Sequence, residues 1–298
     1  MAQKKYTKSS QKKTSQKKTE TKKSKSSRFI YIGVLVILFI IYLIDPSILG
    51  IDKNYKAIET DGFHVNNITD GFARLPEGVD YETFDHTYYS YAYCPKYKDS
   101  YWVSYILTKK MVKTVTADRD DEQFVRDPQQ GEDYAITSDY TNSDYDRGHM
   151  CPAGDMNFNQ TAMTETFYLT NISPQKPGLN RGIWKELEEQ VRDWAVKNDS
   201  LYIVAGAIFS QNPKKIGENN VAVPSKFYKV VADISAKDGY KAIAFVFDNK
   251  DYPDDAEFMD YAITVNELEE MTGIDFFANF QNEDVELIES TLNKNHWK

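Results

Sequence analysis

The chain has little cysteine and little histidine. Its 298 residues include two cysteines, Cys94 and Cys151, and four histidines. Neither cysteine lies in a C-x-x-C pair, which argues against a zinc knuckle. The two thiols therefore either form a disulfide, if the domain faces an oxidising compartment, or stay unpaired and buried. The sequence also has no internal repeats.

Positive charge is scarce after the first 28 residues. Residues 1–28 hold 11 of the 36 basic residues and one of the 45 acidic residues, so this segment carries +10 and the remainder carries −19. Proteins that bind nucleic acid are usually basic over the binding domain. The acidic body therefore argues against simple electrostatic binding of nucleic acid, and leaves a local basic groove or a bridging metal as the alternatives.

Long apolar runs are also missing, with one exception at residues 29–44, where 16 residues carry no charge. Residues 46–49 extend this run toward the roughly 20 residues that span a bilayer. The lysines before it predict a cytoplasmic N-terminus and an exported body. We interpret residues 29–49 as a transmembrane helix. The alternatives are a signal peptide, whose cleavage would release a secreted protein, and a buried core helix.

These features divide the chain into four parts. Residues 1–28 are too polar to build a core, so we expect a disordered cytoplasmic tail. Its lysines are better explained by topology and attraction to anionic lipid than by a nucleic-acid arm. Residues 29–49 form the anchor or signal segment, and residues 50–79 a polar linker. Residues 80–298 form the globular domain.

The globular domain is predicted to have an α+β fold around a mostly antiparallel sheet. Residues 182–198 have the spacing of an amphipathic helix, and a second, short helix is expected to end at Gly273. Residues 117–145 are acidic and irregular, as in a long surface loop. Segments rich in Tyr, Val and Ile predict strands at 88–94, 101–108, 166–173, 200–209, 226–235 and 240–249.

The stretch Asp146-Arg147-Gly148-His149 places one of the few histidines among charges and turn-forming residues. An imidazole with a pKa near neutrality can take a proton from water. Downstream, Asn180 stands at the predicted start of the long helix, where an anion is favoured. Glu188 and Arg192 follow four residues apart, so they share one face of that helix.

This set of residue types suits the hydrolysis of a phosphodiester. Arginine matches the geometry of phosphate through paired hydrogen bonds. A hard cation such as Mg²⁺ takes oxygen ligands and can stabilise the charge that develops on the phosphate. A neutral asparagine as the direct protein ligand would leave most of the charge of the cation available.

Three segments in this order resemble the DNA/RNA non-specific endonucleases, which have a ββα-metal active site: DRGHM, FYLTNISPQ and LNRGIWKELEEQVR. The similarity is strongest over residues 146–192 and continues more weakly to the end of the chain. It implies an endonuclease that uses Mg²⁺, or alternatively Mn²⁺, and cuts DNA and RNA with little sequence preference. A homodimer is compatible with the sequence, which does not show one.

The resemblance also implies a role for each residue of the motif. His149 would be the general base that activates water, and Asn180 the direct ligand of the metal. Glu188 would hold the water around the metal. The supporting and phosphate-stabilising roles would fall to Asp146, Arg147, Asn171 and Arg192.

One position of the family pattern does not carry over cleanly. The family usually has an arginine upstream, before an aromatic residue and Asp-Pro. In ADRDDEQFVRDP, both Arg119 and Arg126 are candidates.

Each functional interpretation has a structural alternative. His149 could be a surface or capping histidine, and Asn180 a plain helix cap. Glu188 and Arg192 could form only an i,i+4 ion pair. Asn171 could be a turn residue at the end of a strand. For the whole chain, the alternatives are a non-catalytic nucleic-acid receptor anchored in the membrane and a phosphodiesterase for smaller substrates.

Overall fold

The computed structural model describes residues 73–131, 134–233, 239–280 and 284–298. The predicted tail, the predicted anchor at residues 29–49 and most of the predicted linker lie outside these ranges. Within them, no helix is both long and apolar enough to cross a bilayer.

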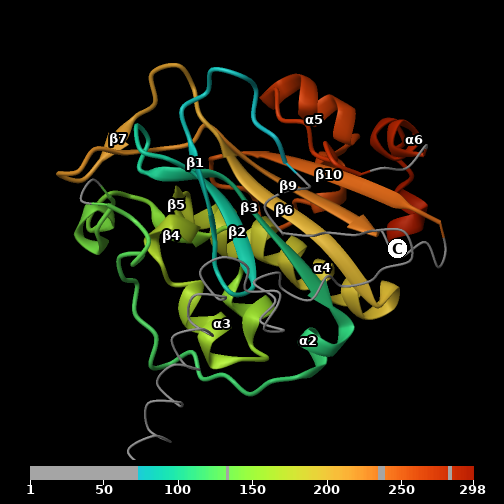
Figure 1. Cartoon of the computed structure of the whole chain (residues 1–298), viewed down its shortest axis with the longest axis horizontal. Helices are drawn as coiled ribbons and strands as arrows, with labels where there is room; N and C mark the ends of the chain where they lie inside the picture. The colour runs from blue at the N-terminus through green and yellow to red at the C-terminus, as the bar shows by residue number, and fades with distance from the viewer. Residues whose placement is uncertain (1–72, 132–133, 234–238, 281–283) are drawn as a thin grey trace, which may run out of the picture. The chain divides into compact units, whose positions relative to one another are not determined.

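In the part of the chain that the structure describes, seven strands form one sheet in the order β1-β2-β3-β6-β9-β10-β11 (Figure 1). Every neighbouring pair is antiparallel, as the sequence predicts. The strands are β1 (Glu82–Asp85), β2 (Tyr89–Cys94), β3 (Asp99–Thr108), β6 (Ser200–Ile208), β9 (Lys226–Asp233), β10 (Lys241–Asp248) and β11 (Ala262–Ile263).

Both faces of this sheet are covered. Along β3, Val103 and Tyr105 point into one apolar core, whereas Trp102 points into a second core on the other face. This alternation follows from the period of two along a strand. Because neither face meets water over these central strands, they contain almost continuous apolar sequence.

Helix α4 (Trp184–Asn198) covers the first face. Leu187, Val191 and Trp194 are each at most 2% exposed, which confirms the apolar face predicted for this helix. The chain enters α4 through a π-helical turn, Leu179–Ile183. Helices α2 (Lys109–Lys113) and α3 (Gln160–Glu165) are short.

Helices α5 (Val265–Thr272) and α6 (Val285–Ser290) cover the second face. Thr264 caps α5 at its N-terminus, where its side chain accepts from the backbone N–H of Glu267. Gly273 ends the helix with a φ of +72°, a conformation that glycine adopts without strain. The predicted end of this helix is thereby confirmed.

The strand expected at residues 166–173 is wrong in its position. Leu169–Asn171 form a 3-10 turn, and strand β5 is Ile172–Gln175, which pairs antiparallel with β4 (Asp146–His149). Within this turn, the side chain of Asn171 forms hydrogen bonds with the backbone of Cys151 and Thr166. A further small hairpin joins β7 (Lys215–Ile216) to β8 (Val221–Ala222).

The acidic segment at residues 117–145 is partly buried, so it is more than a surface loop. Asp127 is 1% exposed and accepts hydrogen bonds from Tyr91 and Thr170, and it lies 2.8 Å from Nε2 of His86. These contacts fasten the loop to the sheet just upstream of the DRGH strand.

The two cysteines and two apolar residues near the start of the described chain are all buried. The structure has both Cys94 and Cys151 as free, buried thiols. Ala73 and Leu75, which lie in the predicted linker, are buried against the second face of the sheet.

Candidate active site

The β4–β5 hairpin presents His149 at the end of β4, opposite Ile172. The imidazole lies between two aromatic rings, with centroid distances of 5.5 Å to Phe124 and 5.1 Å to Phe167. Its Nε2 is buried and has no hydrogen-bond partner among the described residues. A buried polar atom without a partner is unusual in a folded protein and often marks a catalytic group. This half-buried ring between two aromatic side chains is neither a fully exposed histidine nor a helix cap.

The surroundings of His149 keep its imidazole neutral. Burial, together with the positive charge of Arg119, lowers the pKa of His149 to about 3. At neutral pH the ring is therefore the unprotonated form that a general base requires.

The glycine of the DRGH motif is required by packing. A Cβ at Gly148 would stand 2.4 Å from Oε1 and 2.7 Å from Cβ of Gln175. Because the second contact is to an atom near the backbone, the two strands of the hairpin would have to separate. Only glycine allows β4 and β5 to approach this closely.

Arg119, rather than Arg126, lies near the histidine. Its guanidinium stands 5.8 Å from the centre of the Phe167 ring, the same ring that contacts His149. Arg126 donates instead to the backbone carbonyls of Gln130 and Gly131. The geometry therefore favours Arg119 for the position that the sequence analysis left open.

Replacement of Arg119 provides a test of this assignment. We expect Arg119→Ala to raise the pKa of His149 toward its ordinary value of about 6.5 but to leave it lower, because burial remains. We also expect a loss of nuclease activity of about 100-fold. NMR titration of the imidazole would follow the pKa, with Arg126→Ala as the matched control. An unchanged pKa in Arg119→Ala would contradict the assignment.

The lowered pKa of His149 also makes the stability of the fold depend on pH. The folded-state pKa of His149 is below its unfolded value, so between about pH 3 and 6.5 the unfolded chain binds more protons. The contribution of His149 to stability is therefore present above about pH 6.5 and is lost as the pH falls toward 3. Arg119→Ala should narrow the pH range over which this contribution is lost, because it raises the folded-state pKa of His149.

Asn180 is oriented by the DRGH strand. Its Nδ2 donates to Oδ2 of Asp146 at 3.0 Å, and Arg181 donates to both oxygens of the same carboxylate at 2.7 and 2.5 Å. Burial opposes ionisation of Asp146, but the bonds from Arg181 and Asn180 outweigh it and lower its pKa. Because a carboxylate only accepts, the amide nitrogen of Asn180 must face it, which turns Oδ1 away and makes it available as a ligand.

Arg192 and Glu188 do not pair with each other in the way that their spacing suggests. Among the described residues, the ion pair of Arg192 is with Asp155, at 2.9 Å from Nη1 to Oδ1. The hydroxyl of Tyr105 donates to the other oxygen of Asp155 at 2.8 Å. The reading of Glu188 and Arg192 as a simple i,i+4 pair is therefore not what the structure shows.

Glu188, on α4, is half-buried and acts electrostatically on the buried charges Lys229 and Asp155. Burial raises its pKa to about 7, while the positive charge of Lys229 on β9 acts in the opposite direction. Lys229 is fully buried, its Nζ has no hydrogen-bond partner among the described residues, and it lies 4.7 Å from the centre of the Trp184 ring. Sequence analysis missed Lys229 and Asp155. For Lys229, the available sequence signal was its position as a charged residue within the apolar strand KFYKVVAD.

Asn171 acts on the backbone. Its Oδ1 accepts from the N–H of Cys151 at 2.8 Å, and its Nδ2 donates to the carbonyls of Cys151 and Thr166. The chain directly after His149 is thereby held in place. The side chain is fully buried and so does more than end a strand.

Arg147 packs against aromatic rings. Its guanidinium is 5.3 Å from the centre of the Phe124 ring and 5.9 Å from that of Tyr140. Its Nε is buried without a hydrogen-bond partner among the residues described. Arg147 and His149 therefore contact the same ring of Phe124.

A basic and aromatic group that the sequence analysis did not find precedes the motif. The ammonium groups of Lys176 and Lys214 stand 4.7 and 4.9 Å from the centre of the Tyr145 ring. Tyr145 is the residue directly before DRGH. These side chains offer local positive charge and an aromatic surface on an otherwise acidic body.

The donors at this site fit a hard divalent cation. Such a cation prefers oxygen ligands, and the available groups are the Asn180 carboxamide oxygen and the Glu188 carboxylate. The hydrogen bond to Asp146 already orients the carboxamide.

Two antiparallel strands, the first of which ends at His149, are followed by a helix preceded by Asn180, and this is the ββα arrangement that the sequence resemblance implies. The family model for DNA/RNA non-specific endonucleases matches residues 73–283. The chain belongs to this family of nucleases.

Named proteins that are similar in sequence to this chain are also nucleases. The mouse protein "Nuclease EXOG, mitochondrial" is 32% identical over 210 residues, which cover 66% of this chain and 57% of that protein. "Endonuclease G, mitochondrial" of Caenorhabditis elegans is 31% identical over 218 residues, covering 68% of this chain and 70% of its own length. The match to the first relatives spans little more than half of their length.

A solved structure shows the same fold. A chain in the crystal structure of the EndoG/EndoGI complex matches with a TM-score of 0.62 and 30% identity, over 65% of this chain and 85% of that chain. The α+β fold with its antiparallel sheet is therefore shared with a nuclease of known structure.

Proposed function

We propose that this protein is a Mg²⁺-dependent endonuclease that hydrolyses phosphodiester bonds of DNA and RNA with little sequence preference. The observation that carries the proposal is the neutral imidazole of His149, whose buried Nε2 lacks a partner in the described structure. Asn180, with its carboxamide oriented by Asp146, belongs to the same hairpin and helix unit.

In the proposed reaction, His149 removes a proton from a water molecule, whose oxygen attacks the phosphorus. The bond to the 3′ oxygen breaks and this oxygen takes a proton from solvent water, which leaves a 3′-hydroxyl and a 5′-phosphate. The aromatic rings of Phe124 and Phe167 hold the imidazole in place. Asn180 would bind Mg²⁺, with Glu188 holding the water around it, and the cation would supply positive charge to the phosphate and leaving oxygen.

The other charged residues have supporting parts in the proposal. Arg119 and Arg147 lie close to the rings that contact His149 and would stabilise the phosphate. Arg192 is tied to Asp155 and would order the helix that carries Glu188. Lys176, Lys214 and Tyr145 would contact the nucleic-acid backbone and a base face, contacts that carry little sequence information.

Cutting of supercoiled plasmid by the purified full chain tests the function. We expect nicking and linearisation with Mg²⁺, similar cutting of RNA, and complete loss of both on addition of a chelator, with recovery when Mg²⁺ is restored. Plasmid that is bound but never cut would favour the receptor alternative. Cleavage of a dinucleotide analogue without cleavage of polymers would favour a phosphodiesterase.

We further propose that residues 29–49 anchor the protein, with its N-terminus in the cytoplasm and the nuclease domain on the other side of the membrane. This proposal rests on the uncharged run and on the lysines before it. In intact cells, we expect an N-terminal tag to be protected from external protease and the nuclease domain to be digested. Recovery of the domain free in the medium would show cleavage of the segment instead.

A further inference from the structure

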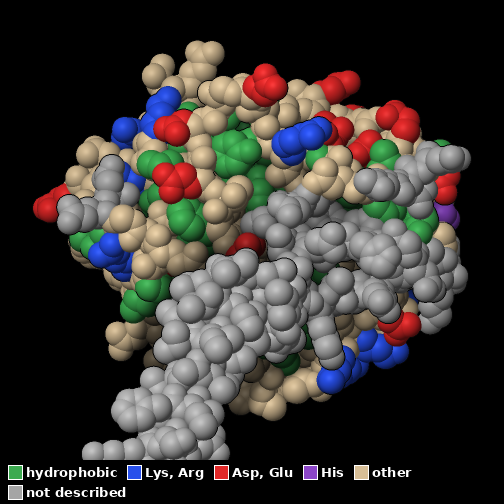
Figure 2. Space-filling view, in the orientation of Figure 1, with side chains coloured by type: hydrophobic (Ala, Val, Ile, Leu, Met, Phe, Trp, Pro, Cys, Tyr) green, Lys and Arg blue, Asp and Glu red, His purple; other side chains and the backbone are tan. Residues whose placement is uncertain are grey.

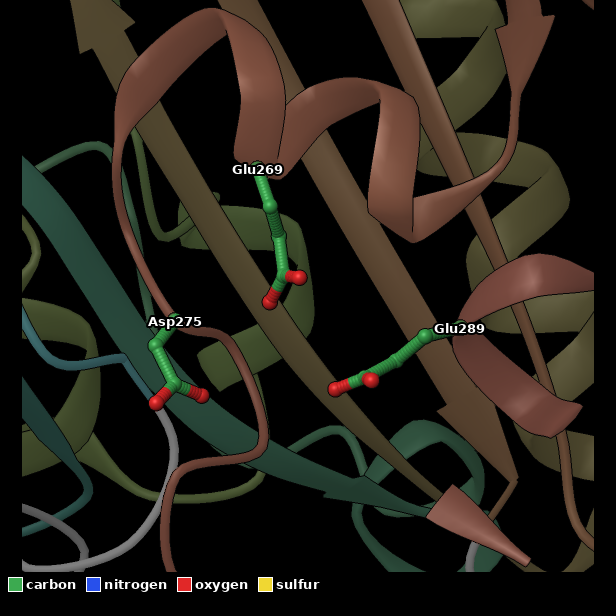
Figure 3. A group of neighbouring side chains, drawn as sticks. All are labelled: Glu269, Asp275 and Glu289. Atoms are coloured by element: carbon green, nitrogen blue, oxygen red, sulfur yellow. The ribbon is translucent and has the colours of Figure 1, made fainter. Parts of the chain in front are cut away.

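Three carboxylates converge on the side of the sheet opposite α4. Glu269 lies in the last turn of α5, Asp275 in the loop that follows, and Glu289 on α6. One carboxylate oxygen from each lies within 4.8 Å of the others. Figure 3 shows the three side chains directed toward a common space. Figure 2 shows further acidic side chains over α5 and α6.

Glu289 is mostly buried, although its side chain is acidic. It is 7% exposed, and no hydrogen bond or ion pair involves its carboxylate among the described residues. Burial and the negative charges of Glu269, Asp275 and Glu286 raise its pKa to about 7. A mostly buried carboxylate that no protein group neutralises destabilises a fold, so such groups are normally paired or bound to a metal.

The carboxylate of Glu269 is held by a backbone N–H, and that of Asp275 by the Arg74 side chain. Oε1 of Glu269 accepts from the N–H of Phe276 at 2.8 Å. Asp275 and Arg74 exchange two backbone hydrogen bonds, at 2.8 and 3.0 Å, and their side chains form an ion pair at 2.6 Å. Both carboxylates therefore already have a hydrogen-bond donor within the fold.

The charge balance indicates the kind of ligand. Three ionised carboxylates and the Arg74 guanidinium leave two negative charges, which a divalent cation would neutralise. The residues within the cluster offer carboxylate oxygens alone, so it does not have the nitrogen and sulfur ligands that zinc prefers.

The number of protein carboxylates favours calcium among hard cations. Ca²⁺ takes roughly six to eight oxygen ligands, at roughly 2.3–2.6 Å, in a flexible shell. Mg²⁺ demands shorter bonds in a strict octahedron and usually keeps several waters. Three protein carboxylates from two helices and a loop suit the larger and more flexible shell.

We propose that Glu269, Asp275 and Glu289 form a calcium site that holds α5 and α6 together. The site joins the two helices that cover the second face of the sheet, where Leu268 and Ile288 belong to the same apolar core. It shares no residue with the proposed catalytic site around Asn180 and His149. Its function is structural stabilisation by an ion other than the one proposed for catalysis.

Thermal unfolding of the full chain tests the proposal. After chelation and removal of metal, we expect Ca²⁺ at a hundred times its Kd to raise the Tm by about 5 °C. The Asn180→Ala variant should show the same rise, because it retains the three carboxylates. Titration calorimetry with CaCl₂ should report one Ca²⁺ bound per chain in that variant.

Two glutamate variants make the result specific. Glu289→Gln should lose the Ca²⁺-induced rise and, without metal, should be at least as stable as the unmodified chain, because it removes a buried like charge. Glu270→Gln changes an exposed carboxylate of α5 outside the cluster and should keep the rise. Equal Ca²⁺ shifts in all variants, or no shift in the unmodified chain, would overturn the proposal. So would a Glu289→Gln variant that is less stable without metal.

Discussion

His149→Ala is expected to reduce the rate of DNA cleavage by about 1000-fold. The imidazole is the only group of the proposed site that combines a neutral form at pH 7 with a buried nitrogen that has no hydrogen-bond partner in the described structure. Its removal therefore takes away the proton acceptor while the arginines and Asn180 remain. Initial rates of plasmid cleavage at saturating Mg²⁺ would measure the loss.

Several controls separate loss of chemistry from loss of folding. His296 is exposed, so His296→Ala should cut at the normal rate. His149→Asn retains a polar side chain between the two aromatic rings and should be as inactive as the alanine variant. Circular dichroism should show both variants folded, and added imidazole should restore part of the rate in His149→Ala. A folded His149→Ala that keeps a tenth or more of the rate would contradict the assignment of His149 as the base.

Asn180→Ala is expected to lower the cleavage rate by 100-fold or more and to raise the Mg²⁺ concentration needed for half-maximal activity. The carboxamide oxygen is the proposed direct ligand, and its loss removes a protein contact to the cation. A titration of activity against Mg²⁺ separates this effect from a simple loss of rate. Asn212→Ala, in an exposed bend, is the control and should behave normally.

Asp146→Asn gives a finer test of the same idea. The carboxylate of Asp146 forces the nitrogen of Asn180 to face it. An amide at position 146 would accept either orientation of the Asn180 side chain, so we expect metal affinity to fall by about 10- to 100-fold while the fold stays intact. A half-maximal Mg²⁺ concentration that stays the same in both variants would show that Asn180 does not bind the metal.

The buried charges under α4 explain how the site can be rigid within an apolar core. Asp155 is bonded to both Arg192 and Tyr105, and Lys229 lies beneath Glu188 with its ammonium over the Trp184 ring. Each charge faces at least one of opposite sign, which reduces the cost of burying the set. The helix that carries Glu188 is thereby held from the side of the sheet.

Local patterns in the sequence were sufficient for most of the fold and for the family. Alternating and continuous apolar runs located the main strands, and the spacing of Leu187, Val191 and Trp194 identified the buried face of α4. These inferences succeed because they depend on neighbours along the chain, where the helical and strand periods apply. The motif residues could be named for the same reason, since their order and spacing are visible in one dimension.

Only the tertiary structure decided how side chains from distant segments meet. The contact of Asn180 with Asp146 joins residues 34 positions apart, and the choice of Arg119 over Arg126 depends on which of them faces the ring of Phe167. Strand β5 begins later than its sequence suggests, after a turn in which the side chain of Asn171 bonds to the backbone of Cys151. The convergence of Glu269, Asp275 and Glu289 has no local signature at all. The physical reason is common to these cases: hydrogen bonds, charges and burial act through space, between groups whose proximity is created only when the sheet and helices pack.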